Sequence, residues 1–414
     1  MYAIVDCNNF YVSCERLFRP DLKDKAIIVL SNNDGCVISR SNEAKALGIL
    51  MGEPYFHIKD LCTKKGVYVF SSNFALYGNL SDRVMCTMEN FWPHIEIYSI
   101  DEAFLDLKTL ANNLHNNFAH TLHKTILQHT GIPVSIGLGQ TKTLAKLANH
   151  VCKKMLQVPV FNIAERPDLL TKIPIDEIWG IGKAFALQLN KLKIFTAFDL
   201  AQTKIRKLPL PIQRTILELN GISALQFSED TAKPKSIMAS RSFKSEQGDL
   251  FSLKQALAAH CQTAYAKLRQ HDLVTQQVQV FVRTNPFKKQ HVQYANRAQY
   301  ALPNPTDNLI NLTSIANKLL DSLYKPNVAY KKIGICLTDF YSKENYQFQL
   351  LKPSTQEEDA KNNRWSNILD SINKKFGRHT LRLATSIPPK TNKPPTYNLS
   401  QAYTTRWQDL PRVK

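Results

Sequence analysis

Two adjacent carboxylates inside an apolar stretch constrain this chain more than any other feature. Asp101 and Glu102 lie between residues 95–97 (Ile-Glu-Ile) and residues 103–107 (Ala-Phe-Leu-Asp-Leu), a run typical of a β-strand. Neighbouring residues on a strand point to opposite faces, so both carboxylates can share a ligand only at a turn or a strand end. An arbitrary Asp-Glu pair is most often the tip of a surface hairpin, because burial of an unpaired carboxylate costs several kcal/mol.

A third carboxylate in an equally apolar setting changes this interpretation. Asp6 follows residues 2–5 (Tyr-Ala-Ile-Val), so a second buried strand delivers an acid. Oxygen ligands of this kind favour a hard cation such as Mg²⁺ over Zn²⁺. In phosphoryl transfer, two such ions activate the attacking oxygen and neutralise charge on the leaving pyrophosphate. We therefore predict a site for two Mg²⁺ ions at Asp6, Asp101 and Glu102.

Two aromatic residues, Phe10 and Tyr11, follow Asp6 closely. A ring packed under the sugar of a bound nucleotide would clash with a 2′-hydroxyl and so select deoxyribose. On spacing alone, however, two core rings of the first helix are the better interpretation.

Length and charge suggest several domains and a polyanionic partner. The chain has 414 residues and a formal net charge of +19, so we expect two to four domains. Residues 1–100 carry ten Lys and Arg against eleven Asp and Glu, whereas residues 240–343 carry fourteen against six. A near-neutral front and a basic rear suit a catalytic region followed by parts that bind a polyanion, although charge alone decides nothing.

The cysteines and apolar runs indicate a cytoplasmic protein. Eight cysteines are scattered without a Cys-x-x-Cys pair, which predicts reduced thiols, no disulfide framework and no structural zinc. The longest apolar runs fall well short of the roughly 18 residues of a membrane span. We therefore expect no membrane association.

The order of expected elements predicts an α+β multidomain fold. Residues 1–165 mix strands (2–6, 26–30, 36–38, 134–137) with helices (8–18, 41–47, 73–92, 108–130, 141–155), and residues 166–232 look all-helical. A short linker at 233–239 precedes a β-α-β…α-β pattern over 240–343. Beyond 344 the pattern weakens, so we expect one helix near 356–376 and then a largely flexible tail.

Two further features suggest contacts with nucleic acid. Gly180 and Gly182, in residues 178–182 (Ile-Trp-Gly-Ile-Gly), allow a tight turn that aims N–H groups at a phosphate; a plain turn between helices is the alternative. In the basic region, Arg241, Lys244, Arg283 and Lys288 fall on expected strands and turns.

Three motifs together resemble the palm motifs of Y-family translesion DNA polymerases. They are residues 6–16 (Asp-Cys-Asn-Asn-Phe-Tyr-Val-Ser-Cys-Glu-Arg), 98–104 (Tyr-Ser-Ile-Asp-Glu-Ala-Phe) and 135–148 (Ser-Ile-Gly-x4-Lys-x2-Ala-Lys-x-Ala). Residues 30–37, 43–48, 179–182 and 403–406 add a similarity to the catalytic subunits of bacterial DNA polymerase V. The resemblance implies error-prone, template-directed synthesis from dNTPs in translesion synthesis and SOS mutagenesis, without proofreading, in the bacterial cytoplasm near the nucleoid.

The resemblance also implies roles for individual residues. Asp6, Asp101, Glu102 and the backbone carbonyl of Cys7 would hold the two Mg²⁺ ions. Tyr11 falls at the steric-gate position, and Phe10 would pack against the incoming nucleotide. Positions near the triphosphate fall on Asn42, Lys45 and Lys153, with Lys154 an equally basic rival. Lys45 and Asn42 stand where many members have Arg and Tyr, so the bidentate guanidinium is lost.

By the same resemblance, the chain divides into polymerase domains. Residues 1–22 and 72–165 would be the palm, 23–71 the fingers, 166–232 the thumb with a helix-hairpin-helix, and 240–343 the DNA-binding little finger. Residues 344–414 would bind partners, namely UmuD′ dimers, a RecA filament and the sliding clamp. Gln347, Leu350 and Leu351 resemble a clamp-docking peptide, although a short edge strand is the alternative.

Two other classes of function are compatible with parts of the sequence. The first is a non-catalytic DNA-binding or scaffold subunit with the same fold, and the second is a metal-dependent nuclease built on the same acids. Three crowded carboxylates argue against a scaffold, because only a bound cation gives them a physical reason to be together. An aromatic gate such as Tyr11 argues against a nuclease.

Overall fold

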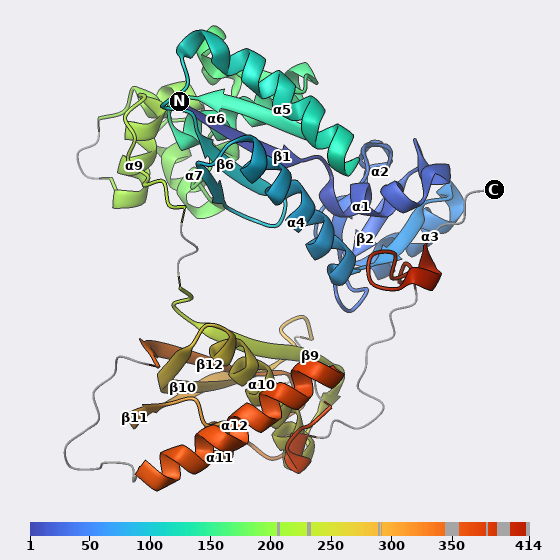
Figure 1. Cartoon of the computed structure of the whole chain (residues 1–414), viewed down its shortest axis with the longest axis vertical. Helices are drawn as coiled ribbons and strands as arrows, with labels where there is room; N and C mark the ends of the chain where they lie inside the picture. The colour runs from blue at the N-terminus through green and yellow to red at the C-terminus, as the bar shows by residue number, and fades with distance from the viewer. Residues whose placement is uncertain are drawn as a thin grey trace. The chain divides into compact units, whose positions relative to one another are not determined.

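The computed structural model divides the chain into two compact units (Figure 1). Unit 1 contains Met1–Thr231 and Pro395–Lys414, and unit 2 contains Ala232–Pro394. The structure describes residues 1–204, 208–229, 233–288, 290, 292–343, 356–377, 380–386 and 398–410. Within these ranges, no helix is long and apolar enough to cross a membrane.

A five-stranded sheet forms the centre of unit 1. Its order is β5-β6-β1-β7-β8, and the strands are Tyr2–Cys7 (β1), Ile95–Ile97 (β5), Glu102–Asp106 (β6), Val134–Gly139 (β7) and Val160–Asn162 (β8). The apolar strand expected at 2–6 is central because it pairs with β6 on one side and β7 on the other, antiparallel in both cases. Buried on both faces, a strand must be apolar nearly throughout, and β1 is.

Helices cover both faces of this sheet. Alternate residues of β1 point to opposite faces: Ala3, Val5 and Cys7 pack in the core beneath α4 (Phe74–Phe91) and α5 (His115–Thr130), which lie side by side. Tyr2 and Ile4 face the other way, toward α6 (Lys142–His150). The single helix expected over 141–155 is α6 followed by a π-helical segment, Val151–Leu156.

A smaller three-stranded sheet follows β1 in unit 1. Its order is β3-β2-β4, with strands Ile27–Leu30 (β2), Val37–Arg40 (β3) and Tyr68–Ser71 (β4). Helices α1 (Phe10–Phe18), α2 (Asn42–Ala46) and α3 (Tyr55–Lys65) accompany it. Strand β4 and helix α3 were not expected from the sequence. The described residues after β8, up to 229, form no further strand; their longer helices are Lys183–Lys191 (α7), Ala197–Ala201 (α8) and Leu210–Leu219 (α9).

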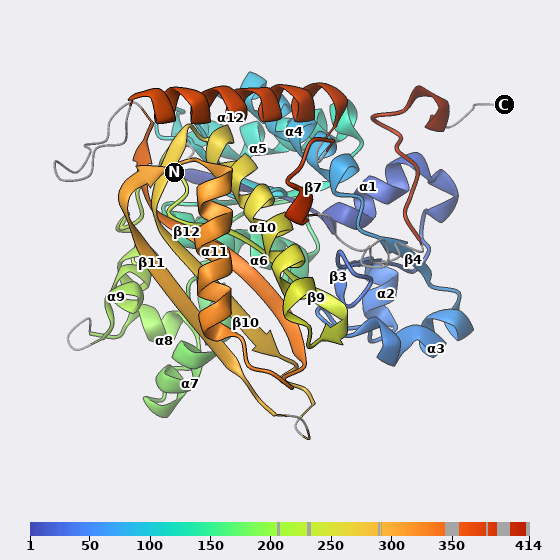
Figure 2. The same cartoon turned by 90° about the horizontal axis from the view of Figure 1, so that it is seen from below.

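Unit 2 is a four-stranded antiparallel sheet with helices on one face. The sheet order is β11-β10-β12-β9; its strands are Ile237–Gln247 (β9), Leu273–Thr284 (β10), Ala295–Thr306 (β11) and Tyr330–Ser342 (β12). Helices α10 (Leu250–Gln270) and α11 (Leu309–Leu323) cover it (Figure 2). The elements of the expected β-α-β…α-β order are all present, but the expectation was incomplete because it lacked β11. That strand is at the sheet edge and mostly exposed, so it lacks the apolar alternation that reveals a strand.

The C-terminal region contributes to both units. Helix α12 (Gln356–Phe376) is tied to α10 by Asp370, which accepts hydrogen bonds from Arg269 Nε at 2.8 Å and from Tyr265 at 3.2 Å. Residues 398–410 pack on unit 1, where Tyr403 is buried and stacks on Phe18 with ring centroids 4.6 Å apart. The expectation of a flexible tail was therefore wrong for residues 398–410.

Candidate active site

The register of the central sheet brings the three carboxylates together. Asp6 on β1 lies directly opposite Glu102 on β6, and directly opposed residues share a face. Asp101 comes just before β6, at the end of the β5–β6 hairpin, and its carbonyl accepts a hydrogen bond from Cys7 N–H at 2.8 Å. The strand end that allows adjacent acids to face one site is therefore present.

One lysine of α6 and one of the π-helical segment after it pair with two of the three acids. Lys146 of α6 forms an ion pair with Glu102 at 2.7 Å, and Lys153 of the π-helical segment forms one with Asp6. The pKa of Asp6 is raised to about 7, because burial and the Glu102 carboxylate raise it by more than the Lys153 ammonium lowers it. Crowded carboxylates in a half-buried site are stable as anions only beside cations.

The carboxylate oxygens fit a hard cation, but those of Asp6 and Glu102 are paired with lysines and one of Asp101 is hydrogen-bonded to a serine. Asp101 accepts a hydrogen bond from Ser99 Oγ at 2.6 Å. The Cys7 thiol is buried and burial raises its pKa, so this residue could offer only its carbonyl oxygen. Among the described residues, no three His, Cys, Asp or Glu side chains are arranged to hold a metal ion. When a metal ion binds, Asp6 and Glu102 would exchange their lysine ammonium groups for the metal ion, so their negative charge would stay compensated.

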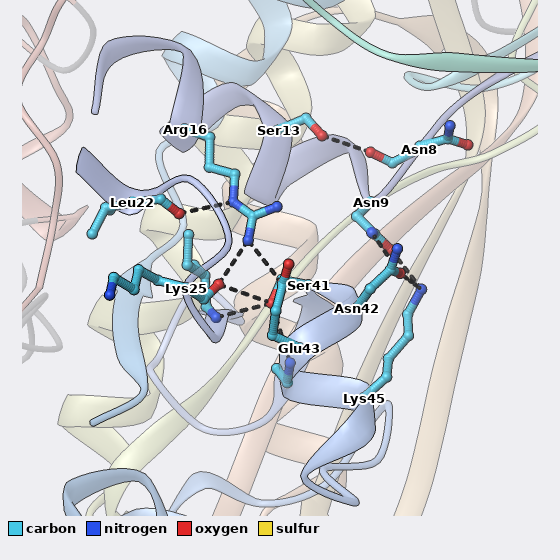
Figure 3. A network of polar contacts seen from close by, with 12 residues as sticks. Asn8, Asn9, Ser13, Arg16, Leu22, Lys25, Ser41, Asn42, Glu43 and Lys45 are labelled. Carbon is cyan, nitrogen blue, oxygen red and sulfur yellow. Dashed lines mark hydrogen bonds and ion pairs between the residues drawn. The ribbon is translucent and has the colours of Figure 1, made fainter. Parts of the chain in front are cut away.

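A polar cluster joins the residue before α1 to helix α2 (Figure 3). Lys45 donates hydrogen bonds to Asn9 Oδ1 at 2.7 Å and to Asn42 Oδ1 at 3.1 Å. Asn9 precedes α1 in the left-handed conformation (φ 47°), which Asn tolerates better than most residues. Burial lowers the pKa of Lys45, and nearby cations, including Lys153 and Lys154, lower it further. This concentration of positive charge would be relieved by a polyphosphate.

Arg16 holds α2 in position for this cluster. Its guanidinium donates to Glu43 at 2.8 Å, to the Lys25 carbonyl at 2.6 Å and to the Leu22 carbonyl at 3.2 Å (Figure 3). Two carbonyls of the segment after α1 and one carboxylate of α2 use the planar fork of Arg, which Lys could not reproduce. Glu43 follows Asn42 on α2, so Arg16 fixes the helix that carries Lys45.

The two aromatic residues of α1 have different environments. Phe10 is 4% exposed and packs in the core of unit 1, and the expected contact between its ring and a nucleotide stays a prediction. Tyr11 is half-buried and stacks on Tyr77 of α4, with centroids 4.5 Å apart and planes 17° apart. Burial raises the pKa of Tyr11, and the Asp101 carboxylate raises it further.

Geometry separates the rival lysines 153 and 154. Lys153 pairs with Asp6, whereas Lys154 points to Glu177, at 2.6 Å.

Gly180 follows a short 3₁₀ turn that includes Glu177, and its φ of +88° requires glycine. Gly182 caps the N-terminus of α7.

Only part of the predicted basic set shares a face of the unit 2 sheet. Arg283 lies opposite Lys332, which lies opposite Ser242, on the face away from the helices. Arg241 lies opposite the buried Ile333, so its side chain leaves the strand on the helix-covered face. Lys244 and Lys288 are exposed, and Lys288 pairs with Glu246 at 3.0 Å.

Sequence reasoning missed several residues around these sites. On the open face of the sheet these are Lys332 and Arg297, and around the predicted nucleotide-binding residues they are Asn9, which contacts Lys45, and Tyr77, which stacks on Tyr11. Alternation along β12 would have found Lys332, but Tyr77 shows no local signal because it meets Tyr11 only in the folded chain. Gln347, Leu350 and Leu351 lie outside the described residues.

Comparisons with known proteins agree with this architecture. The model of the impB/mucB/samB family matches residues 5–150, and that of the family's C-terminal domain matches residues 234–350. A domain of unknown function matches residues 364–413. Protein UmuC of Salmonella typhimurium is 39% identical over 424 residues, covering 100% of both chains. Protein ImpB of Salmonella typhimurium is 37% identical over 428 residues, again covering 100% of both.

More distant relatives extend the likeness to named polymerases. DNA polymerase IV of Clostridium acetobutylicum is 26% identical over 352 residues, covering 84% of this chain and 86% of that protein. A solved Y-family DNA polymerase chimera superposes with a TM-score of 0.70 at 22% identity, over 83% of this chain and 100% of the other, and so shows the α+β multidomain polymerase fold. The chain therefore belongs to the impB/mucB/samB family and has the fold of a Y-family DNA polymerase.

Proposed function

We propose that this polymerase extends primers by nucleotidyl transfer at Asp6, Asp101 and Glu102, and acts in error-prone bypass of damaged templates during SOS mutagenesis. The observation that carries the proposal is the placement of these acids at one end of the central sheet, beside cations of two helices. Family likeness implies use of a divalent metal. Two Mg²⁺ ions, when bound to these carboxylates and the Cys7 carbonyl, would activate the primer 3′-oxygen and neutralise the leaving pyrophosphate.

The chain's own residues would bind and orient the incoming dNTP. Lys45 and Lys153 converge on one region and would pair with the triphosphate once Asp6 is engaged elsewhere. The contact that Lys154 makes with Glu177 favours Lys153 over it. Asn42 would act through Lys45, because its Oδ1 accepts a hydrogen bond from the Lys45 ammonium. Tyr11, half-buried beside Asp101, would exclude the 2′-hydroxyl as a steric gate.

We propose that the chain divides into polymerase domains, of which the thumb and the little finger would bind DNA. We assign residues 1–22 and 72–165 to the palm, 23–71 to the fingers and 166–232 to the thumb, with Gly180 and Gly182 near a backbone phosphate. Residues 240–343 would be the little finger, and the open sheet face with Arg283 and Lys332 would follow the DNA backbone. Phosphate contacts of this kind give binding that depends on salt and tolerates sequence. UmuD′ dimers, a RecA filament and the sliding clamp are the proposed partners.

Primer extension tests the proposal. The intact protein, supplied with accessory partners, Mg²⁺ and dNTPs, should extend a primed template, and Asp101→Ala should reduce the rate by more than about 100-fold. Asp106→Asn is the matched control, because this acid is at the other end of β6, beside Lys108; it should leave the rate close to that of the wild type.

The same assay separates the alternatives. A scaffold subunit would bind the primed template without extending it, and a nuclease would shorten the primer. Absence of extension by the intact protein with its partners would overturn the polymerase assignment of this site.

A further inference from the structure

The C-terminal region is divided between the two units. The match to a domain of unknown function covers residues 364–413. Its first described part packs on α10 of unit 2, where Gln262 donates to the Leu381 carbonyl at 2.9 Å. Its second described part, residues 398–410, belongs to unit 1; we call it the C-terminal segment. These two parts therefore have separate structural roles.

The C-terminal segment is anchored beside β4 and α1. Ser71, the last residue of β4, donates its N–H to the Asn398 carbonyl at 2.9 Å, and Asn398 N–H donates to Ser71 Oγ at 3.2 Å. Tyr403 is 7% exposed and stacks on Phe18, the last residue of α1, with planes only 5° apart. Backbone hydrogen bonds and a buried ring hold the segment in one position.

The segment also contacts the start of α4. Asn73 caps this helix by accepting a hydrogen bond from Leu76 N–H, and its amide group donates to Ser400 Oγ at 2.9 Å and to the Gln401 carbonyl at 3.3 Å. The orientation of the cap, and so of the first turn of α4, therefore depends on the segment.

A buried carboxylate links the segment to the aromatic stack at Tyr11. Glu15 of α1 is completely buried, and its Oε1 accepts hydrogen bonds from Ser400 Oγ at 3.1 Å and from Tyr77 at 2.6 Å. Glu15 Oε2 has no hydrogen-bond partner among the described residues. Tyr77, also fully buried, stacks on Tyr11. The contacts thus run without a break from Ser400 through Glu15 and Tyr77 to Tyr11.

We propose that the C-terminal segment positions the nucleotide-sugar gate, with Ser400 and Glu15 acting through Tyr77 on Tyr11. The proposal rests on the gate function proposed for Tyr11. A steric gate distinguishes a ribose from a deoxyribose only if its ring cannot move away from the sugar. The Tyr77 ring, stacked on Tyr11 with centroids 4.5 Å apart, prevents this movement. Loss of the Ser400 hydroxyl leaves Glu15 with a single donor, so the carboxylate and the Tyr77 hydroxyl can shift together.

The test measures sugar selection in the full-length chain. The ratio of kcat/KM for a dNTP to kcat/KM for the matching rNTP should fall about tenfold in Ser400→Ala and in Tyr77→Phe. Ser400→Thr, which keeps the hydroxyl, should restore the ratio, whereas kcat for the dNTP should change little in all three. Trp407→Ala is the control within the segment, because this side chain is 88% exposed; its ratio should equal that of the wild type.

The outcomes distinguish this inference from the gate itself. Tyr11→Ala should lower the ratio; if it does while Ser400→Ala and Tyr77→Phe do not, the inference is wrong and the gate stands. If Tyr11→Ala leaves the ratio unchanged, the gate role fails.

A second measurement needs no activity. Amide hydrogen exchange in the first turn of α4 should be faster in Ser400→Ala than in Ser400→Thr. Equal rates would overturn the proposal that the C-terminal segment positions Tyr11.

Discussion

Substitution of Gly137 by alanine is the sharpest test of how the active-site face is built. Gly137 of β7 lies under α6, and a Cβ on it would be 2.3 Å from both the Ala145 carbonyl oxygen and the Asn149 nitrogen. Both atoms belong to the helix backbone, so no side chain can rotate away. Helix α6 would have to retreat by about 1 Å to reach ordinary contact at 3.4 Å.

The expected cost follows from this overlap. Overpacking of a core typically costs about 1–3 kcal/mol, and an overlap with backbone should place Gly137→Ala at the upper end. The urea midpoint of unit 1 should fall accordingly. Primer extension should also slow, because α6 carries the Lys146 that pairs with Glu102.

A second glycine provides the control. Gly78 lies inside α4 with nothing within 4 Å of an added Cβ. Gly78→Ala should therefore be stabilising by about 0.5–1 kcal/mol, the difference in helix propensity. Equal midpoints for Gly137→Ala and the wild type would refute the close seating of α6 on β7.

Two further predictions concern buried charge. Burial raises the pKa of Glu15 above its ordinary 4.5, so its contribution to stability is complete below about pH 4.5 and is lost as the pH rises through the folded-state pKa. Glu15→Gln should therefore gain stability relative to the wild type in urea unfolding as the pH rises above about 4.5, and a pH-independent difference would contradict this. Arg269 contacts Asp307 at 2.7 Å and Asp370 at 2.8 Å with its side chain 16% exposed. Arg269→Met should destabilise unit 2 by about 1–3 kcal/mol in thermal unfolding. Arg166→Met, which breaks an exposed pair, should cause no measurable change.

Local patterns were most informative where a side chain's role depends on its own strand. Asp6 and Glu102 stand out because each interrupts an apolar run, and pairing of β1 with β6 then makes them opposite neighbours. Strand β11 was missed because an exposed edge strand buries little and carries no alternation. Arg241 was grouped with Arg283 by charge, but register places them differently.

The amino-acid sequence determined the acids, the α+β class and, through its motifs, the polymerase family. Its apolar periodicity and clustered charge arise from residues close together in the chain. Only the three-dimensional structure decided which lysines pair with the acids and how Ser400 reaches Glu15. These contacts join residues that are tens to hundreds of positions apart in the chain. They form because the folded core packs those segments together, and no local sequence pattern records that packing.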